Sequence, residues 1–151
     1  MLKVKTPVAV VSLLAISALA LGACGSDSDP DVPSASSLVG TWTGSPVGYG
    51  GEGQPKLEAG YPVTFVIKEG DDSSRSFAGE RIVAASDAKK YNTEGNRENI
   101  VGEIAPWGEI SMVNESGTWT LEMDGDDKME GRYLEGGSDL AAKSITLTRQ
   151  K

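Results

Sequence analysis

Residues 118–134 read Thr-Trp-Thr-Leu-Glu-Met-Asp-Gly-Asp-Asp-Lys-Met-Glu-Gly-Arg-Tyr-Leu, and this stretch decides the fold. In residues 118–123, tryptophan, leucine and methionine alternate with polar side chains, which is the period of a strand buried on one face. Residues 128–134 place Met129 and Tyr133 on one face in the same way. The Asp-Gly in the link favours a tight turn between antiparallel strands. The stretch therefore predicts a β-hairpin with one buried face.

The same alternation recurs along the chain and predicts an all-β domain. The eight predicted strands are residues 39–44, 62–69, 76–84, 98–105, 109–113, 118–123, 128–134 and 144–149. Eight short strands in sequence order suit an eight-stranded antiparallel up-and-down β-barrel, with a two-sheet β-sandwich as the alternative. Gly79, Gly102 and Gly131 each follow an apolar residue by two positions, on the inward face. Glycine at such positions permits the coiling that closure of a barrel requires, so the barrel is favoured.

The predicted connections differ in length at the two ends of this barrel. Tight turns follow the second, fourth and sixth strands, whereas long connections at residues 45–61, 85–97 and 135–143 follow the first, third and seventh. The connection after the fifth strand is the exception, because it is short. Since connections of a meander alternate between ends, one end should be closed by hairpins and the other rimmed by long loops.

The N-terminus has the order of parts found in an export signal. Lys3 and Lys5 precede the uncharged apolar run 8–21, which is too short for comfortable membrane spanning. Leu21-Gly22-Ala23-Cys24 then resembles the lipobox of bacterial lipoproteins. That resemblance implies cleavage before Cys24 and attachment of diacylglycerol to its thiol. The alternatives are a plain secretory signal with an incidental cysteine, or a membrane anchor.

We therefore expect three regions: a signal peptide at 1–23, a flexible tether at 24–37 and the β-barrel domain at 38–151. The tether is expected because residues 25–37 are rich in Gly, Ser, Asp and Pro and have almost nothing to bury. Cys24 is the only cysteine, so no intrachain disulfide can form. Lipidation would consume this thiol. The expected location is the extracytoplasmic face of the cell membrane, with the lipid at Cys24 as the anchor.

Composition limits the function classes. The chain has 14 basic and 22 acidic residues, a net charge of −8, and loss of the leader with Lys3 and Lys5 would bring it to −10. Binding to nucleic acid needs clustered Lys or Arg, so no nucleic-acid partner is expected. Histidine is absent, which removes the commonest general base and the usual zinc ligand. We expect a protein that is not an enzyme and holds no cofactor or metal.

Gly40-Thr41-Trp42, at the start of the first predicted strand, resembles the Gly-x-Trp motif of lipocalins and their calycin relatives. In that family the tryptophan lies at the closed end and stacks with a basic residue from a late strand. Arg149, at the end of the eighth predicted strand, has the matching position. The resemblance implies a calycin-like barrel with a Trp42–Arg149 cation–π contact of about 0.5–2 kcal/mol. It also implies that the long connection 45–61 is a lid over the barrel mouth.

The barrel interior is the candidate ligand site, since eight strands enclose either a filled core or one small ligand. Inward glycines favour a cavity, and the lining predicts a small hydrophobic ligand. The candidate ligand-binding residues are Tyr49, Tyr61, Phe65, Phe77, Met112, Trp119 and Tyr133. The alternative to a mobile lid at 45–61 is a floppy connection without function.

The leading hypothesis is a non-enzymatic, lipid-anchored extracytoplasmic barrel that binds a small apolar ligand. The alternative is a cell-envelope protein-interaction module, or a barrel-type protease inhibitor, with a solid core. In that case the loops and Trp107 would contact an envelope protein. The acidic residues at the hairpin tips lack EF-hand spacing and are expected to be solvated turn formers. These residues are Asp71, Asp72, Asp124, Asp126 and Asp127.

Overall fold

The computed structural model describes residues 32–50, 56–59, 61–83, 97–137 and 140–151. The predicted signal peptide and most of the predicted tether, including Cys24, lie outside these residues, as does most of the connection 85–97. A short 3-10 helix, η1 (Ser36–Leu38), precedes ten strands. The strands are β1 (Gly40–Gly44), β2 (Val47–Gly50), β3 (Lys56–Ala59), β4 (Val63–Asp71), β5 (Ser76–Val83), β6 (Arg97–Ile104), β7 (Ile110–Val113), β8 (Thr118–Met123), β9 (Lys128–Glu135) and β10 (Ala141–Arg149).

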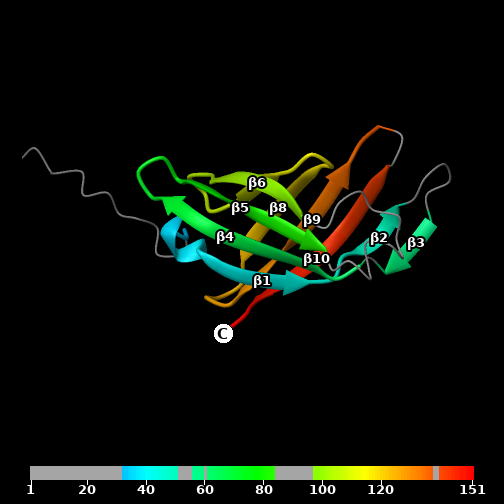
Figure 1. Ribbon diagram of the computed structural model, residues 1–151, viewed down its shortest axis with the longest axis horizontal. Coiled ribbons are helices and arrows are strands. Elements are labelled where there is room, and N and C mark those ends of the chain that lie inside the picture. Colours follow the sequence, from blue (N-terminus) through cyan, green and yellow to red (C-terminus); the bar gives the residue numbers. More distant parts are fainter. Residues whose placement is uncertain (1–31, 51–55, 60, 84–96, 138–139) are drawn as a thin grey trace, which may run out of the picture.

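Eight of these strands form a closed antiparallel barrel (Figure 1). The order is β1-β4-β5-β6-β7-β8-β9-β10, and β10 returns to pair with β1 at Trp42↔Arg149 and Thr43↔Thr148. The prediction of an all-β, eight-stranded up-and-down barrel is confirmed, and the sandwich alternative is wrong. Closure follows from the coiling of strongly twisted strands, which leaves neither β1 nor β10 as a free edge.

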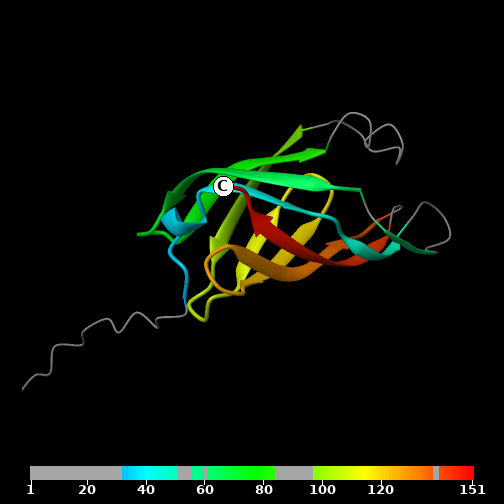
Figure 2. The ribbon, with the colours of Figure 1, turned by 90° about the horizontal axis from the view of Figure 1, so that it is seen from below.

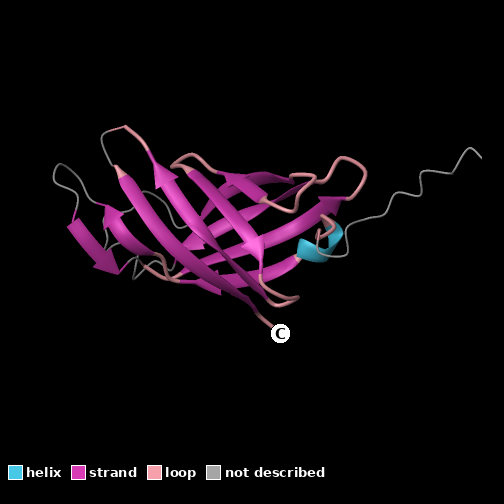
Figure 3. Ribbon diagram, turned by 180° about the vertical axis from the view of Figure 1, so that it is seen from behind, coloured by secondary structure: helices cyan, strands magenta, loops and turns pink. Residues whose placement is uncertain are grey.

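The predicted connection 45–61 contains two strands that the sequence analysis missed. β2 pairs with the first half of β10, and β3 pairs with β2, so a hairpin extends the sheet beyond the barrel (Figure 3). β10 begins at Ala141, three residues earlier than predicted, and β1 covers only its last two residues. β2 supplies partners to the backbone groups that β1 leaves uncovered. At Gly48 an added Cβ would lie 2.3 Å from the Ala142 carbonyl oxygen, so this pairing depends on glycine.

The barrel interior is one continuous cluster of buried side chains. The rings of Phe65 and Trp119 pack edge to face with their centroids 5.1 Å apart. The centroids of the Trp119 and Tyr133 rings are 4.3 Å apart. The inference that inward glycines leave open space is wrong at Gly102, because the Phe77 ring occupies the place of its missing side chain. The members of the cluster are Ala35, Leu38, Trp42, Val63, Phe65, Ile67, Phe77, Ile100, Ile104, Ile110, Met112, Trp119, Leu121, Met129, Tyr133, Ile145 and Leu147.

Trp42 and Arg149 meet at the closed end of the barrel. The guanidinium carbon of Arg149 lies 4.1 Å from the Trp42 ring centroid, and the indole Nε1 donates to the Leu38 carbonyl at 2.9 Å. Arg149 also donates to the carbonyls of Val39 and Ser37, at 2.9 and 2.6 Å. Because these two carbonyls adjoin η1, Arg149 ties the start of the described chain to the end of β10. The described chain therefore enters the barrel at its closed end (Figure 2).

Asp72 holds η1 against the β4–β5 hairpin. The backbone N–H and the hydroxyl of Ser36 both donate to the Asp72 carboxylate at 2.7 Å. These two hydrogen bonds, the backbone one first, hold the pKa of Asp72 below its ordinary value. A lowered pKa in the folded state means that the carboxylate contributes stability above its unfolded pKa, and that this contribution is lost as pH falls through the folded pKa.

We expect Asp72→Asn to lower the melting temperature at pH 7 and to have no effect once acid has protonated Asp72 in the parent protein. Thermal unfolding of both proteins from pH 7 down to about pH 2 measures the difference. Asp126→Asn, at the tip of another hairpin, is the control for the loss of one acidic side chain from a turn. A gap between parent and Asp72→Asn that stays constant over this pH range would contradict the role assigned to the carboxylate.

Candidate functional site

The predicted ligand-binding residues occupy three different environments. Five of them are buried and face into the barrel: Phe65, Phe77, Met112, Trp119 and Tyr133. Tyr61 lies between β3 and β4 and is partly buried. Tyr49 is 58% exposed on the outer face of β2, because the inward positions of this strand are taken by Gly48 and Gly50. The structure thus brings six of the seven residues to the barrel interior or its open end.

Arg81 is a charged residue inside the barrel that the sequence analysis missed. It alternates in phase with Phe77 and Val83 on β5, and it is only 4% exposed. Its guanidinium donates to Glu98 Oε1 at 2.8 Å and also to the Tyr61 hydroxyl. Burial of a charged group costs several kcal/mol unless it is paired and hydrogen-bonded, and these two partners meet that requirement.

Glu98 collects hydrogen bonds from three parts of the chain. Besides Arg81 on β5, the side-chain amide of Asn114 and the hydroxyl of Ser116 donate to its carboxylate, the latter at 3.3 Å. Asn114 and Ser116 belong to the β7–β8 turn at the open end. Glu98 is in phase with the buried Ile100 on β6, so alternation alone would have placed it inside. Alternation along β5 and β6 is thus the sequence signal that could have placed both Arg81 and Glu98 inside.

Two buried donors near this cluster have no hydrogen-bond acceptor among the described residues. They are Nε of Arg81 and Nε1 of Trp119. Phe65 lies beside both, since it is the cross-strand partner of Arg81 and contacts the Trp119 ring. A buried donor without an acceptor costs about 1–3 kcal/mol. Native structures satisfy nearly all such groups, so these two donors are exceptional within the described interior.

Tyr133 adds a third polar group on the same side of the barrel. Its hydroxyl donates to Glu135 at 2.8 Å, and its ring packs on Trp119. Burial, followed by the hydrogen bond to Glu135, raises the pKa of Tyr133 well above its ordinary value. Tyr133 is therefore a neutral phenol at any physiological pH. Together with Arg81, Tyr61 and Trp119 it makes the open end an aromatic interior with fixed donors.

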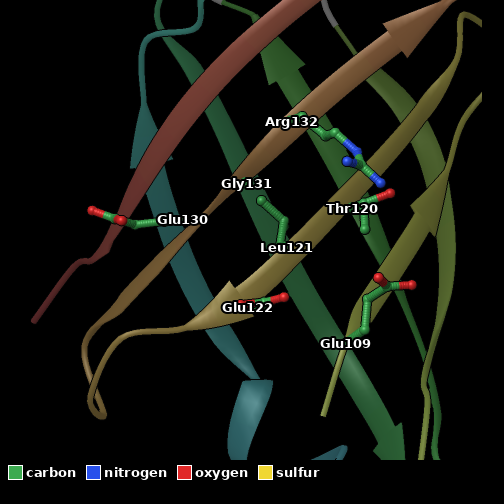
Figure 4. A pocket seen from close by; sticks show the side chains of 7 residues that line it. All are labelled: Glu109, Thr120, Leu121, Glu122, Glu130, Gly131 and Arg132. Carbon is green, nitrogen blue, oxygen red and sulfur yellow. The ribbon is translucent and has the colours of Figure 1, made fainter. Parts of the chain in front are cut away.

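Two shallow hollows lie on the outside of the barrel, and the backbone of Gly131 on β9 contributes to the lining of both. Figure 4 shows the first, in which the carboxylates of Glu109, Glu122 and Glu130 and the guanidinium of Arg132 surround the glycine. Glu122 and Glu130 are direct cross-strand partners. The second hollow is lined by Ser45, Val47, Glu130, Gly131, Ser144, Ile145 and Thr146. Both hollows are open surfaces, unlike the enclosed cluster around Arg81.

Comparison with known proteins supports the fold. No family model and no curated protein matches this chain. Among solved structures it is similar to a redesigned β-barrel, with a TM-score of 0.52 and 11% sequence identity over 80% of this chain and 97% of that one. At this sequence identity, the similarity supports the fold and nothing about function. The described chain is thus a closed eight-stranded antiparallel up-and-down β-barrel with the β2–β3 hairpin added to it.

Proposed function

We propose that this protein is a non-enzymatic, membrane-tethered extracytoplasmic barrel that binds a small, largely apolar ligand at its open end. The observation that carries the proposal is a pair of buried donors, Arg81 Nε and Trp119 Nε1, that have no acceptor among the described residues and that belong to two neighbours of Phe65. The ligand would place an aromatic or aliphatic body against the ring cluster. A carbonyl or carboxylate oxygen of the ligand would accept from the two donors.

The packing of the interior limits the size and place of this ligand. Trp42, Phe65 and Leu121 are fully buried, and the Trp119 ring packs between the rings of Phe65 and Tyr133. Interiors packed in this way leave little room for a deep ligand. The proposed site therefore lies near the open end, where Tyr61 contacts Arg81. Displacement of Tyr61 would give a ligand access to the guanidinium.

The tether is the second part of the proposal. Leu21-Gly22-Ala23-Cys24 supports lipidation at Cys24, and two or more acyl chains anchor a protein stably whereas one does not. The described chain starts at the closed end, next to η1. A short tether from there to the membrane would turn the open end away from the bilayer. A mature charge of −10 would favour a solvated position above an anionic surface.

We expect Cys24→Ser to move the protein from the membrane fraction to the soluble extracytoplasmic or secreted fraction. Serine cannot accept the diacylglycerol, so the anchor is lost while the barrel is unchanged. Fractionation with immunoblotting, and intact-mass analysis of the parent protein for the added acyl mass, measure the result. Ala23→Gly, which keeps a small residue before the cysteine, is the matched control and should remain on the membrane. Membrane retention of Cys24→Ser without other change would contradict lipid anchoring.

The ligand is tested by native mass spectrometry of the full-length protein extracted from its own cell envelope. We expect an additional small-molecule mass on the parent protein, and a loss of about tenfold in its occupancy in Trp119→Phe, which keeps the ring but removes the Nε1 donor. Trp107→Phe, at a tip where the side chain is 75% exposed, is the matched control and should retain the ligand. Absence of any added mass beyond the acyl chains, in a folded parent protein, would contradict ligand binding.

A further inference from the structure

A row of exposed apolar side chains crosses the outside of the barrel near its open end. Val101, Val113, Leu134 and Tyr49 are 57%, 44%, 49% and 58% exposed. They are not scattered, because the register places them on one line across six strands. The line runs through the cross-strand pairs Val101↔Val113, Val113↔Thr118, Thr118↔Leu134, Leu134↔Ala142 and Ala142↔Tyr49. We give the name outer apolar row to the apolar residues of this line, together with the Thr118 that lies between two of them: Val101, Val113, Thr118, Leu134, Ala142 and Tyr49.

The outer apolar row is long enough to receive a segment of another polypeptide. Adjacent strands lie about 4.8 Å apart, so six strands span roughly 24 Å. Side chains directly opposite each other on neighbouring strands are in contact range, which makes the row continuous. Single exposed apolar residues are ordinary on protein surfaces, but a contiguous set marks an interaction site.

Charged side chains lie alongside this row on its closed-end side. One step away, Glu103 and the basic Arg132 occupy outward positions. Two steps away lie Glu109, Glu122 and Glu130, which line the hollow of Figure 4 together with Arg132, so that three carboxylates and one guanidinium give it a net negative charge. We call it the acidic hollow. Glu122 and Glu130 are cross-strand partners on β8 and β9, and like charges at paired positions are destabilising. Lys128 neutralises part of this charge by its contact with Glu130 at 2.7 Å. A cation from another molecule would reduce the remaining repulsion between these carboxylates.

We propose that the outer apolar row and the acidic hollow form a docking surface for a basic, amphipathic segment of a partner protein. The apolar side of the segment would cover Val113, Leu134 and Tyr49, and its Lys or Arg residues would reach Glu122. Charge complementarity selects this occupant. A second copy of the chain, with its net charge of −8, would bring acid against acid, and an anionic membrane would do the same.

The test places a photo-crosslinking amino acid at Val113 or Leu134 of the full-length protein in its own cells. A third position, Lys68 on β4, lies on another wall of the barrel and is the control. We expect one dominant adduct from the two row positions and none from Lys68. Mass spectrometry of the adduct should locate the crosslink in a segment of the partner that is basic and amphipathic.

Substitutions in the same protein decide whether the surface itself is recognised. With the crosslinker at Val113, Leu134→Gln should lower the adduct yield at least tenfold, and Glu122→Gln combined with Glu130→Gln should lower it severalfold. Val39→Gln, a matched change at an exposed valine near the closed end, should leave the yield unchanged. An adduct to a second copy of the chain, to lipid or to an acidic segment would overturn the proposal, as would the absence of any adduct. Adduct yields that stay the same in Leu134→Gln and in the Glu122→Gln, Glu130→Gln variant would overturn it as well.

Discussion

Replacing Trp42 by alanine is expected to lower the free energy of unfolding by about 3–5 kcal/mol. The indole is fully buried, its Nε1 donates to Leu38, and Arg149 covers its face at 4.1 Å. Truncation removes the apolar burial, the cation–π contact and the hydrogen bond at once. It also leaves Arg149 without the ring over which it is placed. Urea unfolding followed by far-ultraviolet circular dichroism measures the loss.

Trp107 provides the matched control for this prediction. Trp107→Ala makes the same chemical change at a hairpin tip of the same end, where the side chain is 75% exposed, and should alter stability by less than about 0.5 kcal/mol. Trp42→Phe should lie between the two, because it keeps a ring under Arg149 but loses the donor to Leu38. Equal losses for Trp42→Ala and Trp107→Ala would show that the Trp42–Arg149 contact does not hold the closed end together.

The second large effect is expected for Glu98→Ala, which should also cost about 3–5 kcal/mol. Glu98 is the charge partner of Arg81, and the two side chains are only 11% and 4% exposed. Without the carboxylate, the guanidinium would remain buried with only the Tyr61 hydroxyl as a hydrogen-bond partner among the described residues. An uncompensated buried charge is the most costly outcome of breaking such a pair.

The double variant Arg81→Met, Glu98→Leu separates the cost of an unpaired charge from the worth of the pair. Removing both charges removes their desolvation penalty, so the double variant should be more stable than Glu98→Ala. Glu80→Ala is the matched control. It removes the partner of Lys68 and Arg97 on the outer face of β5, where both cations are more than half exposed, and it should lower the free energy of unfolding far less than Glu98→Ala does. A double variant less stable than Glu98→Ala would contradict the placement of the pair. The double variant should also lose the proposed ligand, because it lacks Arg81. Its stability and its ligand binding should therefore change independently of each other.

Much of the fold could be predicted from local pattern. Alternation in residues 118–123 and 128–134 depends only on the period of a strand, and β8 and β9 were predicted to within one residue. Tight turns after the second, fourth and sixth predicted strands predicted one closed end. The strands and turns needed no knowledge of which distant residues pair. The contact between Trp42 and Arg149, in contrast, was implied by the resemblance of Gly40-Thr41-Trp42 to the lipocalin motif, and the predicted strand order only placed Arg149 at the same end.

The candidate site could be predicted only in part. Phe65, Trp119 and Tyr133 were expected inside because apolar residues in phase with a strand face the core. Arg81 and Glu98 were in phase as well, yet a charge is buried only when a partner arrives from a neighbouring strand. That partner depends on the β5–β6 register, in which Arg81 stands opposite Glu98. Neither residue alone carries this information.

What the sequence by itself determined was the class of structure: strands with one buried face, the turns between them and the closed end that they form. Only the tertiary structure decided how the barrel closes, because β10 is nine residues long and pairs with both β1 and β2. It also decided which charges lie inside and that Val101, Val113 and Leu134 share one line on the outside. The physical reason is the same in each case. Periodicity is a property of one strand, whereas register, burial of charge and a continuous surface are properties of several strands at once.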